Sequence, residues 1–278
     1  MGGVALVTDN SSGITEDLAA RLGIRVVPVD VIVDGVVLPE GDSIDIAQAV
    51  RDGVKVTTSR STPEAFAKAF ESLASDGYEH VVVVTLSSKL SGTFDSALVA
   101  ARTSPIAVNV CDSRSIGLGL GFPVINAARA AQTGASVDQV LEIVEKGITS
   151  SQVFFYVDSL EYLKRGGRIS ATSALLGTAL SVKPIMTVAD GEVILKEKVR
   201  TQGKALAELV RLAVDCAREC QPSLVGLQYF GDRSLVDQCA IKVLEELPGT
   251  ELLISEVSPV VGVHAGPGLV GIIVSRSA

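Results

Sequence analysis

The feature that most constrains the fold of this chain is an uninterrupted run of four valines, residues 81–84, within the apolar segment 80–86. A strand with one face in water alternates apolar and polar residues, whereas a strand covered on both faces is apolar throughout. The run therefore predicts a central, parallel strand with helices on both sides of its sheet.

Strand-like and helix-like segments alternate on either side of this run. The expected strands are residues 4–8, 25–33, 80–86, 106–111 and 153–157, and the expected helices are 15–22, 44–51, 62–75, 91–102, 115–133 and 137–148. Thr62 and Pro63 suit the cap and first position of their helix. This βαβ alternation predicts a doubly wound parallel sheet.

The pattern changes after Ser159. Ala189-Asp190-Gly191 separates two apolar strands at 182–188 and 192–199, and Asp-Gly in this position is typical of a hairpin. The remaining expected helices are 171–180, 202–220 and 234–246, and the remaining strands are 224–230, 252–257 and 269–274. We therefore expect a mixed α+β second domain, with a boundary near Asp158 that divides the chain into residues 1–158 and 159–278.

Composition excludes several functions. The net charge is −8 and only 4% of residues are aromatic, which disfavours nucleic acid as a partner because phosphates are repelled and stacking platforms are few. The histidines, His80 and His264, are far apart, so we expect neither a metal site nor a bound cofactor. Cys216 and Cys220 lie one helical turn apart and are interpreted as small apolar filler rather than a metal or redox pair.

The N-terminal residues contain no basic stretch followed by an apolar one, and no apolar run is long enough to span a bilayer. The sequence thus predicts a soluble protein with no membrane span, located in the cytoplasm.

Four segments contain unusual chemistry: VTTSRSTP (56–63), LSSKLSGT (86–93), KVRTQ (198–202) and VGVHAGPG (261–268). Ser91 follows the central strand, where ligands bind in open α/β sheets, but the residues alone favour a role as the cap of the next helix, and one serine can do both. Arg200 could offer a fork of donors to a carboxylate or phosphate, or form a surface salt bridge. His264, beside a Gly-Pro-Gly turn, is as compatible with a site as with a structural role.

Eight motifs in order along the chain resemble those of the DegV family. They are VTDNSSGI (7–14), TSRSTP (58–63), LSSKLSGTFDSA (86–97), DSRSIGLGLG (112–121), YLKRGGRIS (162–170), KPI (183–185), KVRTQ (198–202) and HAGPGLVG (264–271). The resemblance implies a fatty acid, such as a C16–C18 acid, in an apolar tunnel at the junction of two α/β domains. It also implies that the protein presents this acid to a separate ATP-dependent kinase, which makes the acyl-phosphate.

The resemblance also implies roles for individual residues. Thr58, Ser91, Gly92 and His264 match the positions that hold the carboxylate. Arg200, in the RTQ motif, matches a residue of the kinase step, and Arg168, in the glycine turn, is a further member of the site. The family usually has Gln-Pro where this chain has Arg60-Ser61. This departure affects the shape of the loop more than carboxylate binding, and Arg60 could add a cation near the site.

Two other functions remain open from the residues alone. A hydrolase or acyl transferase could use Ser91 and His264, with an aspartate such as Asp9 completing a triad. However, LSSKLSGT differs from the GxSxG motif expected around such a serine. A regulatory protein without any ligand is the second alternative.

Overall fold

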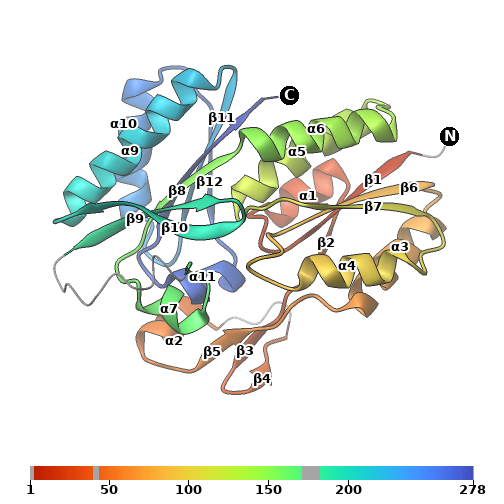
Figure 1. The fold of residues 1–278 in the computed structure, drawn as a ribbon, viewed down its shortest axis with the longest axis horizontal. Coiled ribbons are helices and arrows are strands. Elements are labelled where there is room, and N and C mark those ends of the chain that lie inside the picture. Colours follow the sequence, from red (N-terminus) through yellow and green to blue (C-terminus); the bar gives the residue numbers. More distant parts are fainter. Residues whose placement is uncertain (1–2, 40–43, 171–181, 278) are drawn as a thin grey trace.

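The computed structural model describes residues 3–39, 44–170 and 182–277. It is an α/β fold with three sheets: a four-stranded sheet, a six-stranded sheet and a small three-stranded sheet (Figure 1). The two larger sheets lie side by side, and the small sheet lies below the space between them in this view. The predicted fold class, a parallel-sheet unit followed by a mixed-sheet unit, is confirmed.

The four-stranded sheet is entirely parallel, with the order β2-β1-β6-β7. Its strands are β1 (Val4–Asp9), β2 (Ile24–Val27), β6 (His80–Thr85) and β7 (Ala107–Asp112). The four valines of β6 are fully buried, as the sequence predicts for a central strand. Val81 and Val83 face one apolar cluster, while Val82 and Val84 face the other.

Helices cover both faces of this sheet. Phe66 and Phe70 of α3 (Pro63–Ser75), with Ala97 and Ala100 of α4 (Thr93–Ala101), pack against one face. The other face contacts α5 (Leu118–Gln132) and α6 (Val137–Ser150), and α1 (Glu16–Leu22) packs beside them against α5 and β2. Because α5 and α6 also contact the six-stranded sheet, they form a layer shared by both sheets, and residues 118–128 of α5 are buried on every side.

The six-stranded sheet is mixed, with the order β10-β9-β8-β13-β11-β12. Its strands are β8 (Gln152–Tyr156), β9 (Lys183–Ala189), β10 (Glu192–Val199), β11 (Ser223–Tyr229), β12 (Leu252–Glu256) and β13 (Val270–Arg276). Of the neighbouring strand pairs described in this sheet, β11 and β12 are parallel and the others are antiparallel. The face away from α5 and α6 is covered by α9 (Gln202–Glu219) and α10 (Ser234–Glu246).

The predicted hairpin at Asp190-Gly191 is confirmed, since β9 and β10 pair directly and both turn residues have positive φ. One strand was predicted in the wrong place: residues 153–157 were expected to close the first half, but β8 pairs with β9 and β13. An apolar run does not encode which partner it pairs with, so either sheet fitted the pattern. The domain boundary near Asp158 stays a prediction.

A second correction concerns the predicted strand 25–33. Pro28 interrupts it, because proline has no amide hydrogen to donate to a sheet. Its first part forms β2, and its second part forms β3 (Val31–Val33) of the small sheet, whose order is β4-β3-β5. The other strands of this sheet are β4 (Val36–Val37) and β5 (Val56–Thr58).

Three short helices gather around the small sheet: α2 (Ile46–Arg51), α7 (Glu161–Gly166) and α11 (Pro259–Ala265). The sequence did not predict α7 or α11, and the helix predicted at 171–180 lies outside the described residues. α11 contacts α2, α7 and β5, and so joins three segments that are far apart in the chain. In the described part of the chain, no helix combines the length and the apolar character needed to cross a bilayer.

Candidate ligand-binding site

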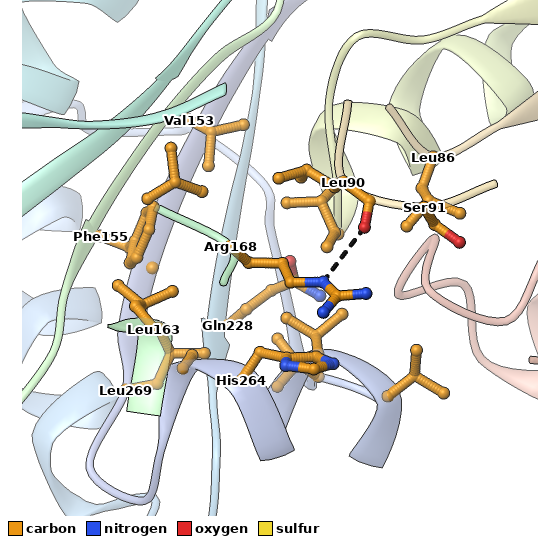
Figure 2. A pocket seen from close by; sticks show the side chains of 18 of the residues that line it. Leu86, Leu90, Ser91, Val153, Phe155, Leu163, Arg168, Gln228, His264 and Leu269 are labelled. Atoms are coloured by element: carbon orange, nitrogen blue, oxygen red, sulfur yellow. Dashed lines mark hydrogen bonds between the residues drawn. The ribbon is translucent and has the colours of Figure 1, made fainter. Parts of the chain in front are cut away.

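An apolar pocket lies between the two larger sheets, bounded below by α7 and α11 (Figure 2). Its walls come from the loops that follow β6 and β7, from strands of the six-stranded sheet, and from the short helices. The apolar lining residues are Val29, Leu86, Leu90, Ile116, Val153, Phe155, Leu163, Val193, Val257, Val260, Val261, Ala265, Leu269 and Ile273. Such a surface suits a hydrocarbon chain, because burying each methylene contributes about 0.8 kcal/mol.

Polar side chains gather in one part of this pocket: Thr58, Ser91, Arg168 and His264. They come from β5, the turn before α4, the segment after α7, and the last turn of α11. The structure therefore brings together three of the four predicted carboxylate-binding residues, with Arg168 beside them. The fourth, Gly92, is adjacent to Ser91 at the start of α4 but does not line the pocket.

Arg200, the remaining predicted site residue, lies elsewhere. It is exposed at the end of β10, directly before the Thr201 residue that caps α9. Arg200 is not among the lining residues. Arg200 is therefore placed to contact a molecule at the protein surface rather than a ligand in the pocket.

His264 is partly buried and hydrogen-bonded to Thr58, with 2.8 Å between His264 Nε2 and Thr58 Oγ1. The other side of its ring lies against Gly166, where a Cβ atom would come within 2.4 Å of Nδ1, so glycine is required for this approach. Burial, helped by the positive charge of Arg168, lowers the pKa of His264 to about 4. At neutral pH the imidazole is uncharged, and its Nε2 can donate or accept one hydrogen bond.

Arg168 places a positive charge at the same end of the pocket. Its Nε donates to the Leu90 carbonyl oxygen at 3.3 Å, and its Nη1 donates to the Gly166 carbonyl oxygen. Figure 2 shows the side chain between Leu90 and His264. Within residues 3–39, 44–170 and 182–277, no carboxylate lies within ion-pair distance of Arg168. A partly buried cation without a protein anion favours a negatively charged ligand.

Ser91 lines the pocket and also accepts a hydrogen bond from the backbone of α4. Its Oγ accepts a hydrogen bond from the Thr93 amide at 3.3 Å and lies 2.9 Å from Thr93 Oγ1. Ser91 thus bonds to the backbone at the start of α4, as a capping residue does, although Gly92 rather than Ser91 occupies the cap position. A hydroxyl oxygen has two lone pairs and one hydrogen, so Ser91 retains capacity for a ligand oxygen.

The described residues do not assemble a catalytic triad. The ring nitrogen of His264 that faces a hydroxyl is bonded to Thr58 rather than to Ser91. Asp9 is fully buried at the end of β1, where it accepts hydrogen bonds from the Leu86 amide and from the amide and hydroxyl of Ser11. Burial raises the pKa of Asp9 despite these bonds. Its interactions hold the turn after β1 against the loop after β6, so Asp9 does not orient His264.

Gln228 of β11 is a polar residue of the pocket wall that was not predicted from the sequence. Its Oε1 accepts from the Leu118 amide at 2.9 Å, and its Nε2 donates to Ser255 Oγ at 3.3 Å. The amide fits between Gly13 and Gly117, where Cβ atoms would approach it within 2.2 and 2.3 Å. Gln228 therefore ties the six-stranded sheet to the start of α5. The available signal was a glutamine within an otherwise apolar strand, LVGLQYF.

A second link between the sheets is the turn of the β9–β10 hairpin. Ser87 Oγ, after β6, donates to the Gly191 carbonyl oxygen at 2.7 Å. Lys89 and Glu192 form an exposed ion pair of 3.7 Å beside it. Because Val193 follows this turn and lines the pocket, the contact fixes one wall.

Comparison with known proteins assigns the chain to a family. The model of the DegV family matches residues 3–277, so the chain belongs to that family. A DegV domain-containing protein of Streptomyces coelicolor is 40% identical over 276 residues, which are 98% of each chain. One of Mycobacterium tuberculosis is 35% identical and covers 99% of this chain and 98% of its own.

Solved structures of relatives have the same fold. A fatty-acid-binding DegV family protein from Thermus thermophilus superposes with a TM-score of 0.92 at 35% identity, covering 99% of both chains. DegV from Bacillus subtilis, described as a fatty acid binding protein, has a TM-score of 0.90 at 26% identity, covering 99% of this chain and 100% of its own. A stearic acid-binding protein from Eubacterium ventriosum has a TM-score of 0.88 at 25% identity, covering 100% and 99%.

Proposed function

We propose that this protein binds a long-chain fatty acid, with the acyl chain in the apolar pocket and the carboxylate among Thr58, Ser91, His264 and Arg168. The observation that carries the proposal is the position of Arg168, a cation that has no ion-pair partner among the described residues and lies at the polar end of an otherwise apolar pocket. The fatty-acid-binding relatives of the same fold support it.

The energetics agree with this assignment. An acyl chain with more than a dozen methylenes gains on the order of 10 kcal/mol on burial, before the ordering costs of binding. The carboxylate loses its hydration there and needs hydrogen bonds and a nearby positive charge in return. Hydroxyls, a neutral imidazole and a guanidinium supply both.

The first test is direct binding. Purified protein, stripped of lipid, should bind palmitate but bind methyl palmitate at least ~10-fold more weakly, because the ester lacks the charge that Arg168 attracts. Ser91→Ala should weaken palmitate binding, whereas Ser88→Ala should not, since the Ser88 hydroxyl bonds to Asp112 outside the pocket. Equal affinity for acid and ester would contradict a carboxylate site at this end of the pocket.

We further propose that the bound acid is presented to a separate kinase, which forms the acyl-phosphate from ATP. The resemblance of the KVRTQ segment supports a role for Arg200 in this step, and its exposure suits contact with a second protein. Arg200→Gln should leave palmitate binding unchanged and abolish acyl-phosphate formation when the kinase of the same organism and ATP are added. Loss of palmitate binding in this variant would instead make Arg200 part of the pocket.

A further inference from the structure

A second arginine lies at the polar end of the pocket, on its outer side. Arg60 follows the pocket residues Thr58 and Ser59 and is exposed. Its guanidinium rests against Gly92, where a Cβ atom would lie 2.8 Å from Nη1 and 3.0 Å from Cδ. Glycine at position 92 therefore allows Arg60 to approach the backbone next to Ser91.

The two arginines contact the residues on either side of Ser91. Arg168 donates to the carbonyl oxygen of Leu90, the residue before Ser91, and Arg60 lies against Gly92, the residue after it. Arg168 reaches this position from the pocket wall, and Arg60 reaches it from the exposed loop. In the described part of the chain, neither arginine has a carboxylate within ion-pair distance.

The proposed kinase reaction adds negative charge to the bound head group, so one arginine would not balance the charge of the product. One carboxylate oxygen bonds to the terminal phosphorus of ATP while the bond from that phosphorus to the bridging oxygen of ADP breaks, giving acyl-phosphate and ADP. The bound head group changes from a carboxylate with one negative charge to a phosphate monoester-like group with nearly two. Phosphate oxygens are matched by the planar fork of an arginine.

We propose that Arg60 binds the phosphoryl group of the acyl-phosphate and contributes little to binding of the fatty acid itself. This inference rests on the proposed function, because it concerns the product of that reaction. Arg168 balances the carboxylate inside the pocket, and Arg60 supplies the second positive charge from the exposed loop beside Ser91.

The test compares two ligands with equal chains, palmitate and hexadecyl phosphate, and needs no kinase. Their affinities are measured by calorimetry for the wild-type protein, Arg60→Gln and Arg102→Gln, with melting temperatures to show that each variant is folded. Arg102 is an exposed arginine at the opposite end of α4 and controls for loss of one surface charge.

Arg60→Gln should weaken hexadecyl phosphate binding at least ~10-fold and change palmitate binding less than ~3-fold. Arg102→Gln should change neither. An equal loss for both ligands, or no loss for hexadecyl phosphate, overturns the role of Arg60 while leaving the fatty-acid site intact. A wild-type protein that binds neither ligand would instead contradict the proposed function.

Discussion

Thr58 and His264 are separated by 206 residues, yet their side chains share a hydrogen bond of 2.8 Å. Thr58 ends β5 of the small sheet, and His264 lies in the last turn of α11, which packs against β5. The bond joins a hydroxyl to a neutral imidazole, and the hydroxyl can rotate its hydrogen toward an incoming carboxylate. The polar end of the pocket is thus formed by tertiary packing rather than by a local motif.

The hydroxyl of Thr58 should therefore contribute to ligand affinity. Thr58→Val keeps the side-chain shape but removes the hydroxyl, and we expect palmitate affinity to fall about 10-fold because a charged carboxylate loses a hydrogen bond. The matched control is Thr57→Val, the preceding residue on β5, which is exposed and does not line the pocket. The affinities of both variants are measured by isothermal titration calorimetry. An equal loss of palmitate affinity in the two variants would contradict the role of Thr58.

His264 should make the ligand-free protein sensitive to mild acid. Its pKa is about 4 in the folded protein and about 6.5 when unfolded, so below pH 6.5 the unfolded chain binds a proton that the folded protein does not. Stability is therefore lost as the pH falls from 6.5 toward 4. Between pH 7.5 and 5.0 the free energy of unfolding should fall by about 2 kcal/mol more in the wild type than in His264→Gln.

Urea denaturation of both proteins at the two pH values measures this difference. The difference between the two proteins is free of the contributions of all other titrating groups, because these groups are common to both chains. Identical pH dependence in the two proteins would mean that His264 keeps an ordinary pKa in the folded state.

Removal of the cation at the pocket should weaken acid binding without affecting neutral ligands. Arg168→Gln should lower palmitate affinity at least ~10-fold and leave the binding of methyl palmitate within ~2-fold. Arg165→Gln is the matched control: Arg165 is exposed, pairs with Glu161 at 2.7 Å and does not line the pocket. If Arg168→Gln weakened both ligands alike, the arginine would be holding the pocket together rather than attracting the carboxylate.

The contact between the β9–β10 turn and the loop after β6 should contribute to stability. In Gly191→Ala the new Cβ would come within 2.5 Å of Ser87 Oγ, at a residue whose φ is +81°. We expect a loss of about 1–3 kcal/mol. Gly203→Ala, in the first turn of α9, meets nothing within 4 Å and should be neutral or stabilising. Denaturation midpoints that were equal for the two variants would show that the turn does not require glycine.

Much of the fold could be predicted because its signals are local. The four valines of β6 indicated a central parallel strand, and the Asp190-Gly191 pair indicated a hairpin, and both are confirmed. Pairing partners carry no such signal, so β8 was assigned to the parallel sheet of the first half although it belongs to the six-stranded sheet. The short helix α11 was missed because its stability comes from packing against α2, α7 and β5 rather than from its seven residues.

For the site, the motifs indicated Thr58, Ser91 and His264, and these residues line one pocket. The roles assigned to them remain predictions. Gln228 could not be assigned from sequence, because its importance depends on Gly13 and Gly117, which approach it only in the folded protein. The same limit applies to Arg60, whose contact with Gly92 is not evident from the loop sequence.

The position of β13 has a consequence for how the protein is synthesised. This strand, residues 270–276, follows all the other described strands in the sequence, yet it lies between β8 and β11 and pairs with both. While the ribosome makes the preceding residues, the facing edges of β8 and β11 have no partner, and exposed edges of this kind invite pairing with other chains. The growing polypeptide therefore has unpaired strand edges from the time β8 emerges until β13 inserts between β8 and β11.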